Sequence, residues 1–133
     1  MNLSEINWLG MLLGIVAGFV LGALWYGPLF GKQWMQALGI VKDDAKKVNM
    51  GMLFGGSFIT YIVLGVIIAI IYKLTNGNCW QHGLHIGALV GLASTTTIFN
   101  NALYEMKPLK LMLINGVYAL LNAAIIGLAI GAV

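Results

Sequence analysis

Amide and hydroxyl side chains gather in the second half of the third long apolar stretch of this chain and recur in the fourth. In the fourth stretch Asn115, Tyr118 and Asn122 follow one another at i, i+3 and i+7, which is one face of an α-helix. In hydrocarbon each such group requires a hydrogen-bond partner, because an unpaired one is unfavourable by several kcal/mol. The sequence therefore predicts a polar layer between the third and fourth apolar helices, formed by Thr96, Asn100, Asn101, Asn115, Tyr118 and Asn122.

Two roles are compatible with this polar layer. Uncharged amides often do no more than join one helix to another, with about 0.6 kcal/mol per hydrogen bond. Polar residues inside a membrane also mark the paths of solutes and ions. Glu105 and Lys107 follow the third stretch and would stand at the inner mouth of such a path. A carboxylate there is either a solvated anchor or a site for a proton or cation.

Other residue types that carry chemistry are sparse. His82 and His85 stand at i and i+3, but two ligands without a nearby acid are too few for a metal site. Cys79 is the single cysteine, so an internal disulfide is excluded. The chain contains no nucleotide-binding loop, nucleophile elbow or zinc motif. We expect no enzymatic activity, no metal and no cofactor, since the other acids lie outside the deep parts of the apolar stretches: Glu5, Asp43 and Asp44.

The composition is that of a membrane protein. Hydrophobic residues make up 60% of the 133 residues, charged residues 8%, and the mean hydropathy is +0.92, whereas about a quarter of the residues in soluble domains are charged. Four stretches reach the length of about 20 residues that a membrane-spanning helix needs. We predict an all-α, polytopic membrane protein, a single four-helix domain over residues 1–133 in an up-down bundle, with spans at about 6–26, 50–72, 82–103 and 109–133.

Small residues recur at every fourth position in three of these stretches. Such spacing keeps them on one stripe of a helix, where close contact between backbones drives helix association in lipid. The stripes predict tight helix packing within the chain or between copies, and self-association into a homo-oligomer is expected. The first comprises Gly10, Gly14, Gly18 and Gly22, the second Gly83, Gly87 and Gly91, and the third Ala119, Ala123, Gly127 and Gly131.

The lysines predict how the helices are oriented in the membrane. Lys32, Lys42, Lys46 and Lys47 lie in the first loop and Lys107 and Lys110 in the third, whereas Lys73 alone lies on the opposite side. Short lysine-rich loops stay in the cytoplasm. We therefore expect a multi-pass protein of the bacterial inner membrane with both termini outside the cytoplasm. The net charge of +3 then reflects orientation and contact with lipid head groups, and not binding of nucleic acid.

The first loop has an aromatic cluster, which we call the aromatic box: Trp25, Tyr26, Phe30 and Trp34. Amphipathic rings of this kind anchor helices at the level of the lipid head groups. Gly27 and Pro28 are expected to end the first helix. Residues 33–38 then form a short interfacial helix that ends at Gly39, followed by a solvated stretch of charged residues at 42–47.

Three segments carry a family resemblance. They are Asn7-Trp8, the stretch WYGPLFGKQW at 25–34, and the stretch NALYEMKPLKLMLINGVY at 101–118. In this order they resemble small bacterial membrane proteins grouped as domain of unknown function 1761, with Lys107 at a position where arginine is equally expected. The resemblance implies a four-helix topology over nearly the whole chain and no established activity.

From these observations we expect a self-associating membrane protein that forms a path or cavity for a small solute or ion, lined by the polar layer. One alternative is an accessory or structural membrane protein that transports nothing, with a dry and fully hydrogen-bonded bundle. Another is a module that binds lipid or quinone in an apolar groove beside Trp25 and Trp34.

Overall fold

The computed structural model describes residues 3–39 and 50–133, and in these ranges it contains helices and no strand. Three short elements accompany four long helices, and Lys42, Lys46, Lys47 and the rest of the charged stretch at 42–47 lie outside the described residues. In chain order the elements are η1 (Leu3–Glu5), α1 (Trp8–Leu24), η2 (Trp25–Leu29), α2 (Gly31–Leu38), α3 (Met50–Leu74), α4 (Trp80–Tyr104) and α5 (Leu109–Ala132).

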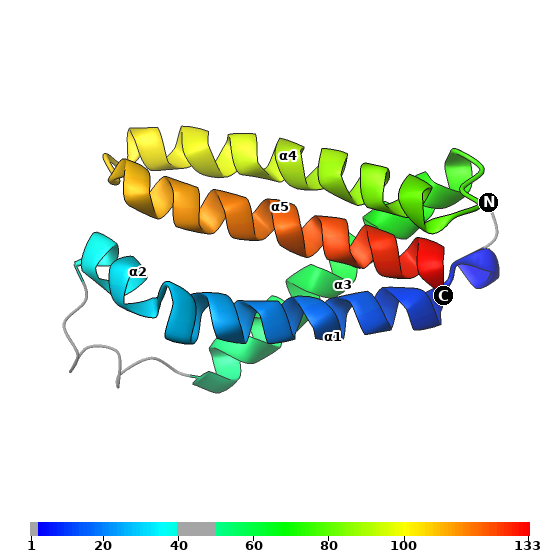
Figure 1. Ribbon diagram of the computed structural model, residues 1–133, viewed down its shortest axis with the longest axis horizontal. Coiled ribbons are helices and arrows are strands. Elements are labelled where there is room, and N and C mark those ends of the chain that lie inside the picture. Colours follow the sequence, from blue (N-terminus) through cyan, green and yellow to red (C-terminus); the bar gives the residue numbers. More distant parts are fainter. Residues whose placement is uncertain (1–2, 40–49) are drawn as a thin grey trace.

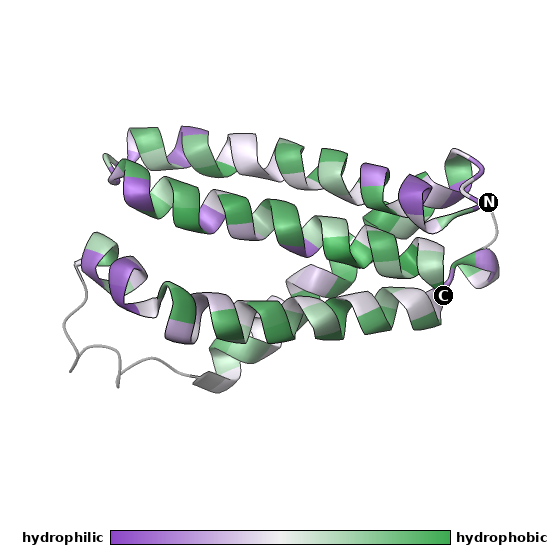
Figure 2. Ribbon diagram, in the orientation of Figure 1, coloured by the Kyte–Doolittle hydropathy of each residue, from purple (hydrophilic) through white to green (hydrophobic). Residues whose placement is uncertain are grey.

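Four segments are long and apolar enough to cross a membrane: Trp8–Leu29, Gly51–Leu74, Trp80–Tyr104 and Leu109–Ala132. Hydrophobic residues predominate along all four helices (Figure 2). Leu9, Val20 and Leu89 are each more than half exposed in the isolated chain. Apolar surface of this extent suits contact with lipid. The predicted all-α, multi-pass membrane fold is confirmed.

The last helix occupies the centre of the molecule. Figure 1 shows α1, α5 and α4 side by side in that order, with α3 crossing behind them at an angle and both chain termini at one end. We call that end the terminal end. We call the other, where α1 passes into η2, α4 ends and α5 begins, the lysine-rich end, because Lys32, Lys107 and Lys110 lie there.

Glycine lines the contact between α1 and α5. A Cβ atom added to Gly14 would lie 2.7 Å from the Cα of Ile126, and one added to Gly10 would lie 2.8 Å from the carbonyl oxygen of Ala129. The same stripe meets the side chains of Asn122 at Gly18 and of Tyr118 at Gly22. Because these glycines carry no side chain, the two backbones approach to contact distance.

A second glycine-lined contact joins α4 to α5. Gly83 lies against Gly127, and Gly87 lies against Ala123. A Cβ added to Gly91 would lie 2.8 Å from the Cα of Leu120. Gly131 meets the backbone of Cys79 and Trp80. Every glycine of the three stripes therefore lies against a neighbouring segment of the same chain. At these glycines there is no room for a second copy.

Helix α3 joins the bundle mainly near the terminal end. Ile68 and Ala69 of α3 belong to one buried cluster with Ile15 of α1, Ile86 of α4 and Ile126 of α5. Towards the lysine-rich end α3 diverges (Figure 1). Its first half is largely uncovered, as shown by Met52 and Ile59, which are 76% and 64% exposed, and by Gly55 and Gly56, which have no atom within 4 Å of an added Cβ.

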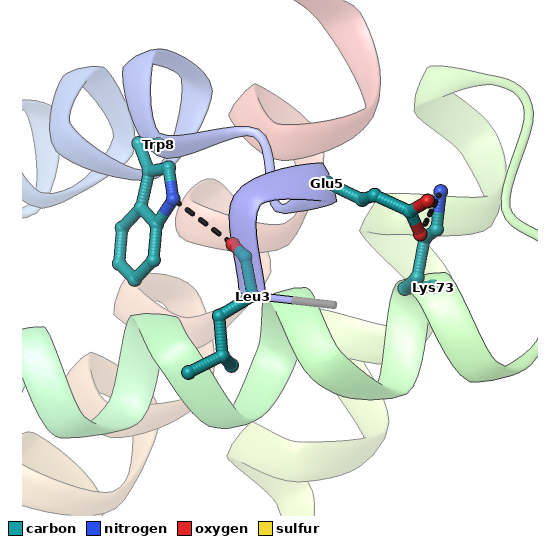
Figure 3. Close-up of polar contacts among 4 residues, drawn as sticks. All are labelled: Leu3, Glu5, Trp8 and Lys73. Carbon is teal, nitrogen blue, oxygen red and sulfur yellow. Dashed lines mark hydrogen bonds and ion pairs between the residues drawn. The ribbon is translucent and has the colours of Figure 1, made fainter. Parts of the chain in front are cut away.

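Polar contacts hold the terminal end together. The side chain of Asn7 caps α1 by accepting from the backbone N–H of Gly10 at 3.0 Å, and its Nδ2 donates to the carbonyl oxygen of Ile130 at 2.9 Å, which ties the start of α1 to the end of α5. Figure 3 shows two further contacts, in which Trp8 donates to the carbonyl of Leu3 and Glu5 pairs with Lys73 at 3.4 Å.

Substitution of a glycine between α1 and α5 should destabilise the protein. In Gly14→Ala the new methyl group meets the backbone of Ile126, so we expect a loss of about 1–3 kcal/mol in the free energy of unfolding. Gly55→Ala is the matched control, because nothing lies near its added Cβ. Unfolding by SDS in lipid–detergent micelles measures both, and equal stability of the two variants would contradict the described contact.

Candidate functional site at the lysine-rich end

Tyr118 links three helices through its hydroxyl group. Its oxygen lies 3.0 Å from the carbonyl oxygen of Gly18 and 2.8 Å from the hydroxyl oxygen of Tyr61. Because Tyr118 has one proton and donates it to Gly18, Tyr61 is the donor in the other bond. The hydroxyl is buried between α1, α3 and α5, so the group predicted for the polar layer serves to join these helices.

Asn122 lies deeper in the same contact and is only 2% exposed. Its Oδ1 has no N–H or O–H partner among the described residues, and it lies where a side chain on Gly18 would begin. The oxygen therefore faces the Cα hydrogen of Gly18, an arrangement in which a weak C–H···O interaction replaces a hydrogen bond. A residue with a side chain at position 18 would collide with this amide.

Asn115 and the aromatic box form a second polar contact beside Tyr118. Tyr26 donates to Oδ1 of Asn115 at 2.8 Å, and Trp25 donates through its indole N–H to the carbonyl oxygen of Ile114 at 3.0 Å. The rings of Tyr26 and Tyr118 meet edge to face with their centres 5.2 Å apart. The single π-helical turn η2, broken at Gly27, thus fastens the end of α1 onto α5.

The other two rings of the aromatic box complete this cluster. Trp34 of α2 packs on Tyr26 with ring centres 5.1 Å apart, and Phe30 packs on Trp25 at 4.6 Å. Helix α2 ends at Leu38 and is capped by Gly39, whose φ of 74° is the left-handed conformation that closes many helices. The box is therefore a packed unit that rests on α5.

The predicted polar layer between α4 and α5 is wrong for most of its residues. On α5, Tyr118 bonds to α1 and α3, Asn115 bonds to η2, and Asn122 lies against α1 with its oxygen unbonded. On α4 the residue that reaches α5 is Thr95, whose hydroxyl lies 2.8 Å from the carbonyl oxygen of Gly116. Thr96 instead donates to the carbonyl of Ala93 in its own helix, and Asn100 and Asn101 are exposed.

The physical reason lies in the helix period. Thr95 continues the four-residue spacing of Gly83, Gly87 and Gly91, and so it shares the face that packs on α5. Thr96 and Asn100 are each one residue beyond that ladder, which turns them about 100° away. The same extension on α1 passes from Gly22 to Tyr26. The spacing in the sequence contained this signal, and the prediction based on depth alone missed it.

A pocket of about 180 Å³ opens between α4 and α5 at the lysine-rich end. It brings together four of the predicted site residues, Asn101, Glu105, Lys107 and Asn115, with four apolar ones, which are Ile98, Ala102, Leu111 and Met112. Thr96, Asn100, Tyr118 and Asn122 are not among the residues that line it. Sequence reasoning did not single out the apolar half of this lining, since nothing in the local pattern distinguishes it from other lipid-facing residues.

The turn between α4 and α5 positions the two charged residues. Lys107 donates its backbone N–H to the carbonyl of Ala102 at 2.9 Å and Met106 donates to Leu103 at 3.2 Å, which is the Schellman arrangement of a helix end. Met106 takes the left-handed conformation, with φ of 56°, where glycine is usual. The reversal of the chain brings Lys107 back over the last turn of α4.

The charges of the pocket are unpaired. Within the ranges that the structure describes, neither Glu105 nor Lys107 lies within 4.0 Å of an oppositely charged group, although both line the same pocket. The amide of Asn101 likewise has no hydrogen bond to a described residue, whereas Asn115 uses its oxygen for Tyr26. One acidic, one basic and two amide residues thus line one small volume.

The two histidines lie at the terminal end, away from this pocket. His82 contacts the hydroxyl of Thr75 at 2.9 Å through Nε2, and the ring of Tyr72 meets it edge on. His85 is exposed. In the described part of the chain, no three residues among histidine, cysteine, aspartate and glutamate are close enough to hold a metal ion.

The four apolar helices and the all-α architecture define a small multi-pass membrane protein. The family model described as protein of unknown function, DUF1761, matches residues 9–131, and the chain belongs to this family. The resemblance found in the three sequence segments is thereby confirmed. No curated protein and no solved structure matches the chain.

Removing the hydroxyl of Tyr118 should loosen the contact between α1, α3 and α5. Tyr118→Phe loses the bonds to Gly18 and Tyr61, so we expect about 1 kcal/mol less stability towards unfolding. Tyr104→Phe is the control, because Tyr104 is 83% exposed. If SDS unfolding shows the same stability for both variants, the hydroxyl of Tyr118 does not join the helices.

Proposed function

We propose that this protein binds a small amphipathic zwitterion at the lysine-rich boundary of the membrane. The observation that carries the proposal is the composition of the pocket: a carboxylate, an ammonium group, two amides and an apolar wall around about 180 Å³. The pocket is smaller than the roughly 300–1,000 Å³ of sites that enclose drug-sized ligands, so it suits a small head group and not a whole lipid or a quinone ring system.

The unpaired charges define the class of ligand. A ligand with a single charge would leave either Glu105 or Lys107 without a partner, whereas a zwitterion satisfies both with charge-assisted hydrogen bonds. A primary ammonium group is favoured over a quaternary one, because Glu105 and the amide oxygen of Asn101 accept N–H bonds. The wall formed by Ile98, Leu111 and Met112 suits the hydrocarbon next to such a head group.

Binding is better supported than conduction along the chain. Tyr118 and Asn122, which were predicted to line a path, are closed in by Gly18 in the contact between α1 and α5. The pocket also contains one carboxylate and one amine without a nucleophile held by a base, and so we propose a binding role without catalysis or cofactor. If the pocket binds nothing, the alternative of an accessory or structural membrane protein would be the better explanation.

The pocket can be tested with defined lipids. Delipidated protein titrated with phosphatidylethanolamine and monitored by native mass spectrometry should bind it, and Glu105→Gln and Asn101→Leu should each weaken this binding about tenfold through loss of a bond to a charged group. Soluble phosphoethanolamine has the same head group without acyl chains, so it separates the two sources of the ligand. If the pocket takes a free zwitterion, phosphoethanolamine should bind as the lipid does. If the pocket takes a lipid head group, only the lipid should bind.

The matched control is Asn100→Leu, an adjacent exposed amide that does not line the pocket. It should bind phosphatidylethanolamine as the wild-type protein does. Equal binding of phosphatidylglycerol, which lacks the ammonium group, or equal loss in all three variants would contradict the proposal.

We also propose that the protein lies in the bacterial inner membrane with its lysine-rich end in the cytoplasm. The support is the unequal distribution of lysine in the sequence, with six in the first and third loops against Lys73 alone on the opposite side. Both termini would then be periplasmic, and alkaline phosphatase fused after Val133 should be active while green fluorescent protein fused there stays dark. Fluorescence of the C-terminal fusion would contradict this orientation, and a fusion after Gly39 provides the opposite control.

A further inference from the structure

Helix α4 carries an exposed seam in its half near the lysine-rich end. Ala93, Thr97, Asn100 and Tyr104 follow one another at intervals of four, three and four residues, and all four are exposed. Intervals of three and four residues keep these side chains on one face of the helix, along which two membrane helices can pack. The seam is separate from the pocket, which meets α4 on another face through Ile98, Asn101, Ala102 and Glu105.

The same seam is occupied by α3 in the other half of α4. Continued towards the terminal end at intervals of three and four residues, it passes through Val90 and Ile86. Ile86 belongs to the buried cluster that contains Ile68 and Ala69 of α3, and Val90 packs against that cluster. Because α3 crosses at an angle and diverges (Figure 1), it covers only this half. The exposed seam therefore continues a helix contact that the fold already makes.

Asn100 gives the seam an exposed amide that has no hydrogen-bond partner among the described residues. Four residues separate it from the end of α4, so its amide lies about 6 Å along the axis from that end, at the edge of the hydrocarbon region. It has no hydrogen bond to any described residue, while the hydroxyl of Thr97 is directed back to the carbonyl of Ala93. At this edge the amide can bond to lipid head groups or to another amide, whereas acyl chains offer neither donors nor acceptors.

We propose that a second copy of this chain packs on this seam, α4 against α4, around a two-fold axis along the membrane normal. A copy inserted with the same orientation has Asn100 at the same depth, so the two Asn100 amides lie opposite each other across the two-fold axis. Each amide is donor and acceptor, and the pair is self-complementary. The small side chains of Ala93 and Thr97 allow the helices to approach.

Disulfide cross-linking in membranes tests the position of the seam. In a Cys79→Ala background, oxidation of Thr97→Cys should yield covalent dimers as the main product. Leu92→Cys is the matched control, since Leu92 is 52% exposed but lies roughly 120° around α4 from the seam, and it should yield at least tenfold less. If Thr97→Cys yields only monomers, the proposal is overturned, and this is the result expected if the chain's own α3 covers the seam. Equal amounts of dimer from both variants would also overturn the proposal.

The role of the amide can be measured separately. Asn100→Leu should weaken the dimer about sevenfold in energy-transfer dilution experiments in liposomes, as expected for the loss of two reciprocal interhelical hydrogen bonds. Asn101→Leu, the pocket variant, should leave the dimer unchanged. Unchanged association of Asn100→Leu would overturn the assignment of the amide. Because Asn100 serves the dimer and Asn101 the ligand, failure of one proposal leaves the other measurable.

Discussion

The rest of the structure depends on one constraint, which is the close contact of α5 with the glycine-lined faces of α1 on one side and of α4 on the other. In lipid the apolar effect does little to drive helices together, so association depends on close packing and on hydrogen bonds between helices. Gly14 and Gly91 show the consequence, because neither position has room for a methyl group against the backbone of α5. A central helix that is held closely on two sides leaves α3 as the one long helix that is free to lie at an angle.

This arrangement separates the polar residues into groups with different roles. Those that face α1 and α3, such as Tyr118 and Asn122, are closed in and stabilise the bundle. Those near the turn between α4 and α5 line a pocket between these two helices. Asn100 belongs to neither group, and its exposed amide points to contact outside the single chain. The same residue types at nearly the same depth thus join helices in one group, line a pocket in a second and stay exposed in a third.

Several features of the site follow from local spacing. The ladder that begins at Gly83 predicts that position 95 faces α5, and the ladder that begins at Gly10 predicts the same for position 26. The wrong location of the polar layer arose from grouping residues by depth without regard to the helix face on which they lie. Asn101, Glu105 and Lys107 are close in the chain, so their proximity in the pocket was predictable, whereas the addition of Asn115 depends on how α5 is placed.

The sequence by itself determined four apolar helices, their lengths, the bare stripes and the break at Gly27 and Pro28, because hydrophobicity, helix period and backbone restriction act within a few residues of each position. Only the tertiary structure decided that α5 enters between α1 and α4, that α3 crosses behind them, and that the stripes are used within one chain. These outcomes depend on which helix packs against each small-residue stripe. Stripes of similar composition are interchangeable in the sequence and become distinct only when all four helices pack together.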